Sequence, residues 1–156
     1  MKVSDLMTQQ VATVRSNDSA ATAARLMWDC DCGSLPVLDE GNQVSAIVTD
    51  RDICMAGLFQ DRSLGAIPIS QAMSKSIHFC GPDDSVSSAE QIMRAYQIRR
   101  LPVLDGERRL LGILSLADIV RATERDKGRK KEMIPEEVTA TLADICTRRE
   151  AAEARA

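Results

Sequence analysis

The amino-acid sequence repeats itself at an offset of 66 residues, and this repeat strongly limits the folds open to the chain. The hexapeptide SLPVLD at 34–39 returns as RLPVLD at 100–105, and the match continues on both sides without a gap. When 3–53 is aligned with 69–119, 14 of 51 positions are identical. Chance would supply about three or four identities at typical amino-acid frequencies. Apolar positions keep the same register in both copies, so we interpret the chain as a duplicated unit.

Each copy predicts the same order of elements, β-α-β-β-α. In the first copy we expect a strand at 11–14, a helix after the N-cap pair Asp18-Ser19, strands at 35–38 and 44–48 around a turn at 39–42, and a helix from Thr49. In the second copy we expect a strand at 77–79, a helix at 85–96, strands at 101–104 and 110–114 around a turn at 105–107, and a helix from Ser115. Pro36 indicates that its strand lies near a sheet edge or starts there. The sequence therefore predicts an α/β (α+β) fold, with two repeats packed about a pseudo-twofold axis and a C-terminal helix.

The repeat divides the chain into three predicted parts: a first repeat at 1–66, a second repeat at 67–123 and a tail at 124–156. The tail begins with the charge run 124–132, which we interpret as solvated linker or helix surface. A helix then starts at Pro135-Glu136-Glu137, because proline and acidic residues suit the first turn of a helix.

The predicted tail helix carries one narrow apolar stripe. Val138, Leu142 and Ile145 form the stripe, and Cys146 is an optional fourth member. An isolated amphipathic helix of this length is marginally stable in water, so it should dock on another surface. Docking on its own domain and docking on a partner subunit both stay open. We regard this helix as a candidate output or dimer element.

Composition narrows the classes of protein that fit. Apolar residues make up 44% and charged residues 28% of the chain, as in globular proteins. No run of 18 apolar residues predicts a membrane span, and the start MKVSDLMTQQ lacks the apolar segment of a secretory signal. We therefore expect a cytoplasmic protein without membrane contact. A net charge of −3, four aromatic residues and a single basic cluster at 129–131 argue against a nucleic-acid partner.

Cysteine and histidine usage argues against disulfides and metal sites. Five cysteines, at 30, 32, 54, 80 and 146, cannot all pair, and we expect them to be reduced. The pair Cys30-Asp31-Cys32 lacks a second ligand pair at zinc-finger spacing, and His78 is the only histidine. No Ser-His-Asp, HExxH or P-loop pattern is present either. We therefore predict no metal site and no catalytic residue, so that the protein is not an enzyme.

A short polar motif recurs at the same place in both copies. Thr49-x-x-Asp52 and Ser115-x-x-Asp118 each follow an apolar strand and begin a helix. One interpretation is a capping box, in which hydroxyl and carboxylate satisfy backbone N–H groups of the first turn. The other is a ligand site, because a helix N-terminus attracts phosphate and a carboxylate can accept two hydrogen bonds from a ribose diol. Both interpretations stay open at this point.

The order and spacing of these motifs resemble a tandem pair of CBS domains, the Bateman module, over about residues 2–123. The resemblance rests on two copies of LPVLD, a turn and an apolar strand that ends in the [ST]-x-x-D motif. It implies a stand-alone regulatory protein without an obligate cofactor, whose two clefts bind an adenine nucleotide or derivative such as AMP, ADP, ATP or S-adenosylmethionine. It also implies a homodimer that reports ligand state to an unidentified protein partner. The alternative is a ligand-free interaction or dimerisation scaffold.

The resemblance assigns positions to the two clefts. Asp118 holds the ribose in one cleft and Asp52 in the other, while Ser115 and Thr49 face the ribose or phosphate. The adenine and phosphate contacts come from the first strand and the segment before it, from the helix start, and from residues just ahead of LPV. For the Asp118 cleft these residues are Thr8, Val11, Ala12, Cys32, Gly33 and Arg100. For the Asp52 cleft they are Arg51, Ser74, Ile77, His78, Ile98 and Arg99.

Several of these residues also have a purely structural interpretation. Arg51 fits an exposed residue of a first helical turn, and Arg99 and Arg100 fit a surface where they pair with acids. His78 fits a half-buried strand residue, and Thr8 fits a turn.

One departure from the family pattern separates the two clefts. Ala46 stands where the family usually has glycine, which Gly112 keeps in the second copy. Cys32-Gly33 keeps the adenine side of the Asp118 cleft small, whereas Ile98-Arg99 makes that side of the Asp52 cleft bulkier. We therefore expect the Asp118 cleft to be the better nucleotide site, and the Asp52 cleft to be empty, weaker or differently selective.

Overall fold

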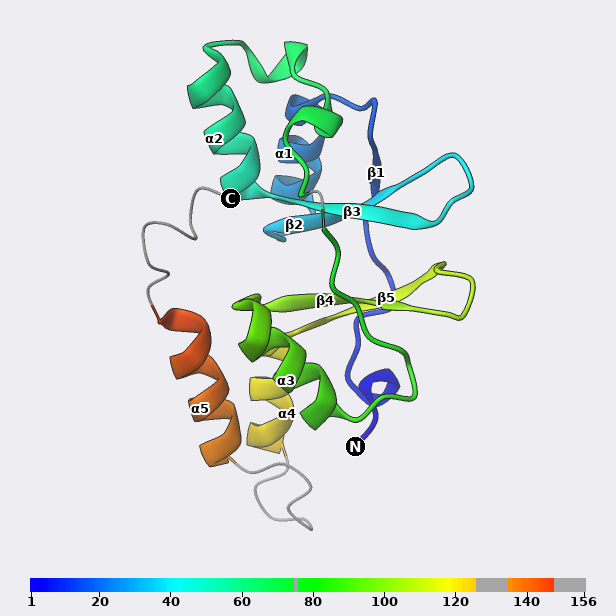
Figure 1. The fold of residues 1–156 in the computed structure, drawn as a ribbon, viewed down its shortest axis with the longest axis vertical. Helices are drawn as coiled ribbons and strands as arrows, with labels where there is room; N and C mark the ends of the chain where they lie inside the picture. The colour runs from blue at the N-terminus through cyan, green and yellow to red at the C-terminus, as the bar shows by residue number, and fades with distance from the viewer. Residues whose placement is uncertain (75, 126–134, 148–156) are drawn as a thin grey trace. The chain divides into compact units, whose positions relative to one another are not determined.

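A computed structural model of the chain describes residues 1–74, 76–125 and 135–147 (Figure 1). The α-helices are α1 (Ala20–Asp29), α2 (Asp50–Gln60), α3 (Val86–Tyr96), α4 (Leu116–Arg125) and α5 (Pro135–Cys146). The strands are β1 (Val14–Arg15), β2 (Ser34–Leu38), β3 (Val44–Thr49), β4 (Arg100–Leu104) and β5 (Leu110–Ser115). Short 3₁₀ turns are η1 (Val3–Asp5), η2 (Leu64–Ala66) and η3 (Ile69–Gln71). The predicted α+β class is confirmed.

The strands form one small sheet in each copy of the repeat. In the first copy β2 and β3 pair antiparallel and β1 joins β2 in parallel, and in the second copy β4 pairs with β5. The strand predicted at 77–79 is wrong, because Cys80 makes only a single parallel bridge to Val103. Gly81-Pro82 follows Cys80 at once, and a proline nitrogen has no hydrogen to donate to a ladder.

Pro36 lies in the middle strand of its sheet. β1 pairs only with Val37 and Leu38 of β2, so Pro36 has a ladder neighbour on one side alone, Ile47 of β3. The missing N–H of the proline therefore interrupts no two-sided ladder. The edge position predicted from this proline holds for the residue and not for the strand.

The first helix of each copy begins at the predicted serine. The Ser19 hydroxyl accepts from the Thr22 N–H at 3.1 Å at the start of α1, and the Ser85 hydroxyl accepts from the Ser88 N–H at 3.0 Å at the start of α3. Each bond satisfies a backbone donor that the helix itself leaves without an acceptor. Ala20, Ala23 and Met27 then bury one face of α1, and the residues at the same register bury one face of α3.

The described residues divide into two compact units, and neither unit is a continuous stretch of chain. The α1–α2 unit consists of 9–79 and 104–112, and the α3–α5 unit consists of 1–8, 80–103 and 113–156, as far as these are described. The N-terminal segment thus packs with the second copy of the repeat. The predicted boundaries at 66 and 123 follow the sequence repeat and stay a prediction.

Each unit has an apolar core built from the same aligned positions. Leu35, Val37, Val48 and Ile53 are buried in the α1–α2 unit. Their counterparts 66 residues later are equally buried in the α3–α5 unit, namely Leu101, Val103, Leu114 and Ile119. Full burial of such a side chain contributes about 1.5–3 kcal/mol to folding. The apolar register that the copies share therefore specifies both cores.

α5 docks on α3 and α4 within its own unit, so docking at home is the arrangement observed (Figure 1). Two members of the predicted stripe are correct, since Val138 is buried and Ile145 is half-buried. Leu142 is wrong, because it is 44% exposed, and Cys146 is exposed too. Thr141 is buried to 1% exposure instead, because its hydroxyl donates a hydrogen bond to a buried carboxylate of α3.

Two further predictions concern the tail and the membrane. The basic cluster at 129–131 and most of the charge run at 124–132 lie outside the described residues. Among the helices that the structure describes, none combines the length and the apolar character needed to cross a bilayer.

Candidate ligand-binding sites

The two recurring hydroxyl–carboxylate motifs both form capping boxes. Asp52 Oδ2 accepts from the Thr49 N–H at 2.9 Å and from the Thr49 hydroxyl at 2.7 Å, while the Asp52 N–H donates to Thr49 Oγ1 at 3.2 Å. Ser115 and Asp118 repeat this pattern at the start of α4, with the same 2.9 Å and 3.2 Å backbone bonds. Asp is therefore long enough to close the box in both copies. The cap interpretation describes the motifs as they stand without a ligand.

The second carboxylate oxygen distinguishes the two motifs. Asp118 Oδ1 accepts from the Arg121 guanidinium, and the Asp118 side chain is 11% exposed while Arg121 is 61% exposed. At the aligned position of α2 stands Met55, and Asp52 has no ion pair among the described residues. Sequence analysis missed Arg121, although the spacing of three residues on a helix is a recognisable signal.

A segment from far along the chain lies beside each motif. The Thr8 N–H donates to the Ile113 carbonyl and the Ile113 N–H donates to the Thr8 carbonyl, both at 2.9 Å. Ile113 is two residues ahead of Ser115, so the structure brings Thr8 to the strand that ends in the Asp118 motif. Ser74 holds the matching place 66 residues later, because its N–H donates to the Ile47 carbonyl at 2.9 Å. The predicted pairing of Thr8 with one motif and Ser74 with the other thus has a backbone basis.

The residues just ahead of LPV bond to the first residue of the following helix. The Gly33 carbonyl accepts from the Asp50 N–H at 3.3 Å, and the Arg99 carbonyl accepts from the Leu116 N–H at 2.9 Å. Cys32 and Gly33 therefore share a unit with the Asp52 motif, while 98–100 share a unit with the Asp118 motif. Arg100 was predicted for the Asp118 cleft of its own unit, whereas Cys32, Gly33, Ile98 and Arg99 were predicted for the cleft of the opposite motif. These assignments stay predictions.

The remaining predicted residues lie in the α1–α2 unit. Val11, Ala12, Ile77 and His78 are half-buried, and Arg51 is exposed at the start of α2. Of the arginines ahead of LPV, Arg99 is exposed and Arg100 is half-buried at the first position of β4. Ala46 belongs to the buried core. The expectation that its methyl group weakens ligand binding in the Asp52 cleft stays a prediction.

Ser34 is a residue of this region that sequence analysis missed. It is 6% exposed, and its hydroxyl has no hydrogen-bond partner among the described residues. Ser34 lies opposite Thr49 in the β2–β3 ladder, and opposite side chains of an antiparallel pair share one face of the sheet. The buried hydroxyl is thus on the same sheet face as the Asp52 capping box. The aligned residue of the second copy, Arg100, is a predicted site residue, but no sequence pattern shows that the Ser34 hydroxyl lacks a partner.

A shallow hollow of about 280 Å³ lies beside Asp52 and is open to solvent. It is lined by residues of α2, η3 and the residue after η3, namely Asp52, Met55, Ala56, Phe59, Gln60, Gln71 and Ala72. Met55, Ala56 and Phe59 give the α2 side an apolar part, while Asp52 and the amide groups of the two glutamines are polar.

The cysteines offer no reactive or metal-binding cluster among the described residues. Burial raises the pKa of the Cys80 thiol to about 12, and the nearby Asp84 carboxylate adds to the shift. A thiol with so high a pKa is a poor nucleophile at neutral pH. Cys30, Cys54 and Cys146 are exposed. Within the described ranges, no group of three or more His, Cys, Asp and Glu side chains is placed to hold a metal ion.

Comparison with known families decides the identity of the fold. The model of the CBS domain matches the chain twice, over residues 3–58 and 69–125. The chain belongs to the CBS domain family. It is a tandem CBS pair, and the resemblance derived from LPVLD and the [ST]-x-x-D motif is confirmed.

This CBS pair is similar to several known proteins. The CBS domain-containing protein YhcV of Bacillus subtilis is 40% identical over 117 residues, which cover 75% of this chain and 81% of YhcV. The solved CBS domain pair of protein MJ0100, in complex with 5′-methylthioadenosine and S-adenosyl-L-methionine, is 28% identical with a TM-score of 0.73. The solved structure of CBSX2 in complex with AMP is 26% identical with a TM-score of 0.71. Each solved match covers 81% of this chain and 98% of the other.

Proposed function

We propose that this CBS pair is a regulatory module that binds an adenosine-containing ligand of the AMP, ADP or ATP type and signals its ligand state to a protein partner. The observation that carries the proposal is the repeated, half-buried Asp at a helix start, placed identically in both copies after an apolar strand. Two similar pairs that bind 5′-methylthioadenosine with S-adenosyl-L-methionine, and AMP, support the same ligand class.

The chemistry of the Asp118 motif suits a nucleotide. A carboxylate can accept one hydrogen bond from each hydroxyl of a ribose diol, and the helix N-terminus, with Arg121 bonded to Asp118 and Arg100 in the same unit, favours a phosphate. The ligand competes for oxygens that Ser115 and Arg121 now occupy. Binding therefore exchanges bonds within the first turn of α4 for bonds to the ligand, and this exchange gives the two states different structures.

The Asp52 motif offers a different set of groups. The unpartnered Ser34 hydroxyl gains a hydrogen bond if a ligand reaches it, which lowers the cost of burying that hydroxyl. Arg51 is the nearby cation, while Asp50 and Asp52 are acidic. We propose that this site is weaker for phosphorylated ligands than the Asp118 site.

The wider role follows from the same proposal. The protein is a cytoplasmic homodimer without catalytic activity and without an obligate cofactor, and its signal is a shift between two packings. A ligand shifts such an equilibrium only by the difference between its affinities for the two states. Membrane and nucleic-acid partners are not part of this proposal.

A ligand-free interaction scaffold is the second candidate function. It is favoured by the closed capping boxes and by three exposed apolar side chains on α1 and α2, namely Trp28, Leu58 and Phe59. Exposed side chains of this size often contribute to protein–protein contacts. In this case the [ST]-x-x-D motifs serve only the helices.

Thermal unfolding against AMP, ADP, ATP and S-adenosylmethionine, with GTP as control, separates the two candidates. A ligand at 100 times its Kd stabilises the fold by about 2.7 kcal/mol, which is roughly 5–10 °C in Tm for a chain of this size. We expect such a shift with an adenine ligand, and its loss in Asp118→Ala. If none of the ligands changes the Tm, the nucleotide proposal fails and the scaffold takes its place.

A further inference from the structure

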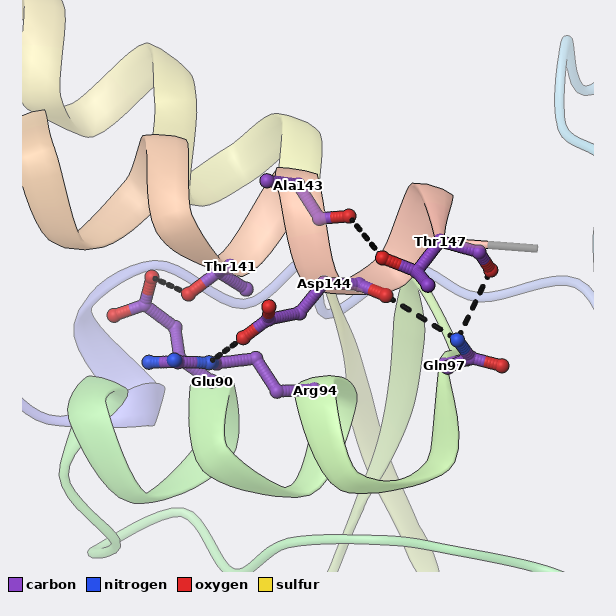
Figure 2. A network of polar contacts seen from close by, with 7 residues as sticks. All are labelled: Glu90, Arg94, Gln97, Thr141, Ala143, Asp144 and Thr147. Carbon is purple, nitrogen blue, oxygen red and sulfur yellow. Dashed lines mark hydrogen bonds and ion pairs between the residues drawn. The ribbon is translucent and has the colours of Figure 1, made fainter. Parts of the chain in front are cut away.

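α5 is held on α3 by a row of polar contacts (Figure 2). The Thr141 hydroxyl donates to Glu90 at 3.2 Å, and Arg94 Nε donates to Asp144 Oδ2 at 2.7 Å. The Gln97 amide donates to the carbonyls of Asp144 at 3.3 Å and Thr147 at 3.0 Å, at the C-terminal end of α5. The three α3-side residues are spaced by four and three positions, so they form one stripe.

This row specifies where α5 docks. At the aligned positions of the first copy stand Ala24, Trp28 and Asp31, which cannot supply the carboxylate, guanidinium and amide of the α3 stripe. The Glu90–Thr141 contact is buried, so a misplaced α5 would leave a polar group buried without a suitable partner. The polar row therefore selects the second copy and one register of α5.

The apolar side of α5 joins a cluster to which both α3 and α4 contribute. Val138 is buried, and Ile145 packs against the same cluster, which contains Ile119 and Ala122 of α4. Leu142 points to solvent for much of its surface. Few apolar side chains of α5 thus hold it in place, and α4 supplies part of the surface on which they pack.

α4 also carries the candidate ligand motif. Asp118 is in its first turn, directly before Ile119 and four residues before Ala122. The bonds of Asp118 to Ser115 and Arg121 fix this turn, and a bound diol would replace some of them. One short helix therefore connects the ligand motif to the surface that supports α5.

We propose that α5 is the output element of the Asp118 site, so that ligand binding and α5 docking strengthen each other. The inference rests on the proposed function. A ligand that holds the first turn of α4 stabilises the surface under Val138, and a docked α5 stabilises the turn that the ligand binds. Linkage is reciprocal. Undocking of α5 therefore lowers the affinity for the ligand by the same factor by which the ligand raises the equilibrium constant for α5 docking.

Hydrogen exchange of the full chain, read by mass spectrometry with and without saturating AMP, tests the coupling. We expect AMP to slow exchange of the α5 amides at 139–146 by about fivefold or more, which is the lower range of typical coupling. Arg94→Asp should speed α5 exchange and weaken AMP binding by a similar factor. The charge-exchanged pair Arg94→Asp with Asp144→Arg should restore both.

The matched control is Trp28→Asp, which places the same new charge at the aligned, 86% exposed position of α1. It should change neither α5 exchange nor AMP affinity. If AMP raises the Tm but leaves α5 exchange unchanged, the coupling is disproved and the proposed function stands. If neither AMP nor another adenine ligand binds, the proposed function fails and the coupling fails with it.

Discussion

The two copies of the CBS repeat share their interior and differ on their surface. Residues that take a left-handed backbone occur at aligned places, Asp31 with Gln97 and Asn42 with Arg108, although the side chains differ. On the outer side of the first helix, by contrast, Trp28 is exposed while Arg94 anchors α5. Duplication has thus kept the backbone and core and changed the residues that choose a covering element. One copy binds its own tail, and the other leaves a large aromatic side chain in solvent.

The shared cores of the two copies predict the largest effect, a loss of folding stability. Leu35→Ala and Leu101→Ala should each destabilise the fold by about 2–5 kcal/mol, because both side chains are almost fully buried at aligned positions. Urea unfolding followed by circular dichroism measures both losses. A loss in one copy that is less than half of the other would show that the two interiors are not equivalent.

The two [ST]-x-x-D motifs predict a difference between the copies in AMP binding. Asp118→Ala should remove the stabilisation by AMP, about 2.7 kcal/mol at 100 times the Kd, whereas Asp52→Ala should keep most of it. The reason is the Arg121 guanidinium beside Asp118, because the aligned residue beside Asp52 is Met55 and offers no charge to a phosphate. Calorimetric titration of both variants measures the affinities. Equal loss in the two variants would contradict the proposed ranking of the sites.

The smallest predicted effect concerns Cys80, whose aligned residue in the first copy is Val14. Burial raises the pKa of the Cys80 thiol to about 12 from an ordinary value of 9.0, so the unfolded chain loses this proton first as the pH rises. Stability is then fully present below pH 9 and falls above it, by about tenfold in the unfolding equilibrium per pH unit. Urea midpoints at pH 8 and pH 10 should differ less in Cys80→Val, and an unchanged difference would refute the assignment.

Local sequence signals predicted most of the fold. The repeat, the serine N-caps, the hairpins and the [ST]-x-x-D motifs follow from short-range patterns, and the structure has them. Thr141 shows where such signals end, because its burial depends on Glu90, which lies 51 residues away. Helical periodicity alone favours Leu142, since the pattern holds no information about a distant carboxylate.

The candidate site was predictable to the same extent. Asp52 and Asp118 are visible because the motif repeats in register. Ser34 and Arg121 were missed for opposite reasons. The unsatisfied hydroxyl of Ser34 is a property of the folded state, while Arg121 was detectable from its spacing to Asp118.

The exchange of segments between the copies has a consequence for how the chain is made. Residues 1–8 are synthesised well before their packing partners at 80–103 and 113 onward. The α1–α2 unit is likewise incomplete until residues 104–112 have been synthesised. Neither unit can be completed by a nascent chain that stops between the repeats, and cutting the gene there should yield two fragments that each lack a piece held by the other. The two repeats should therefore fold together as one pair, although the sequence shows two copies.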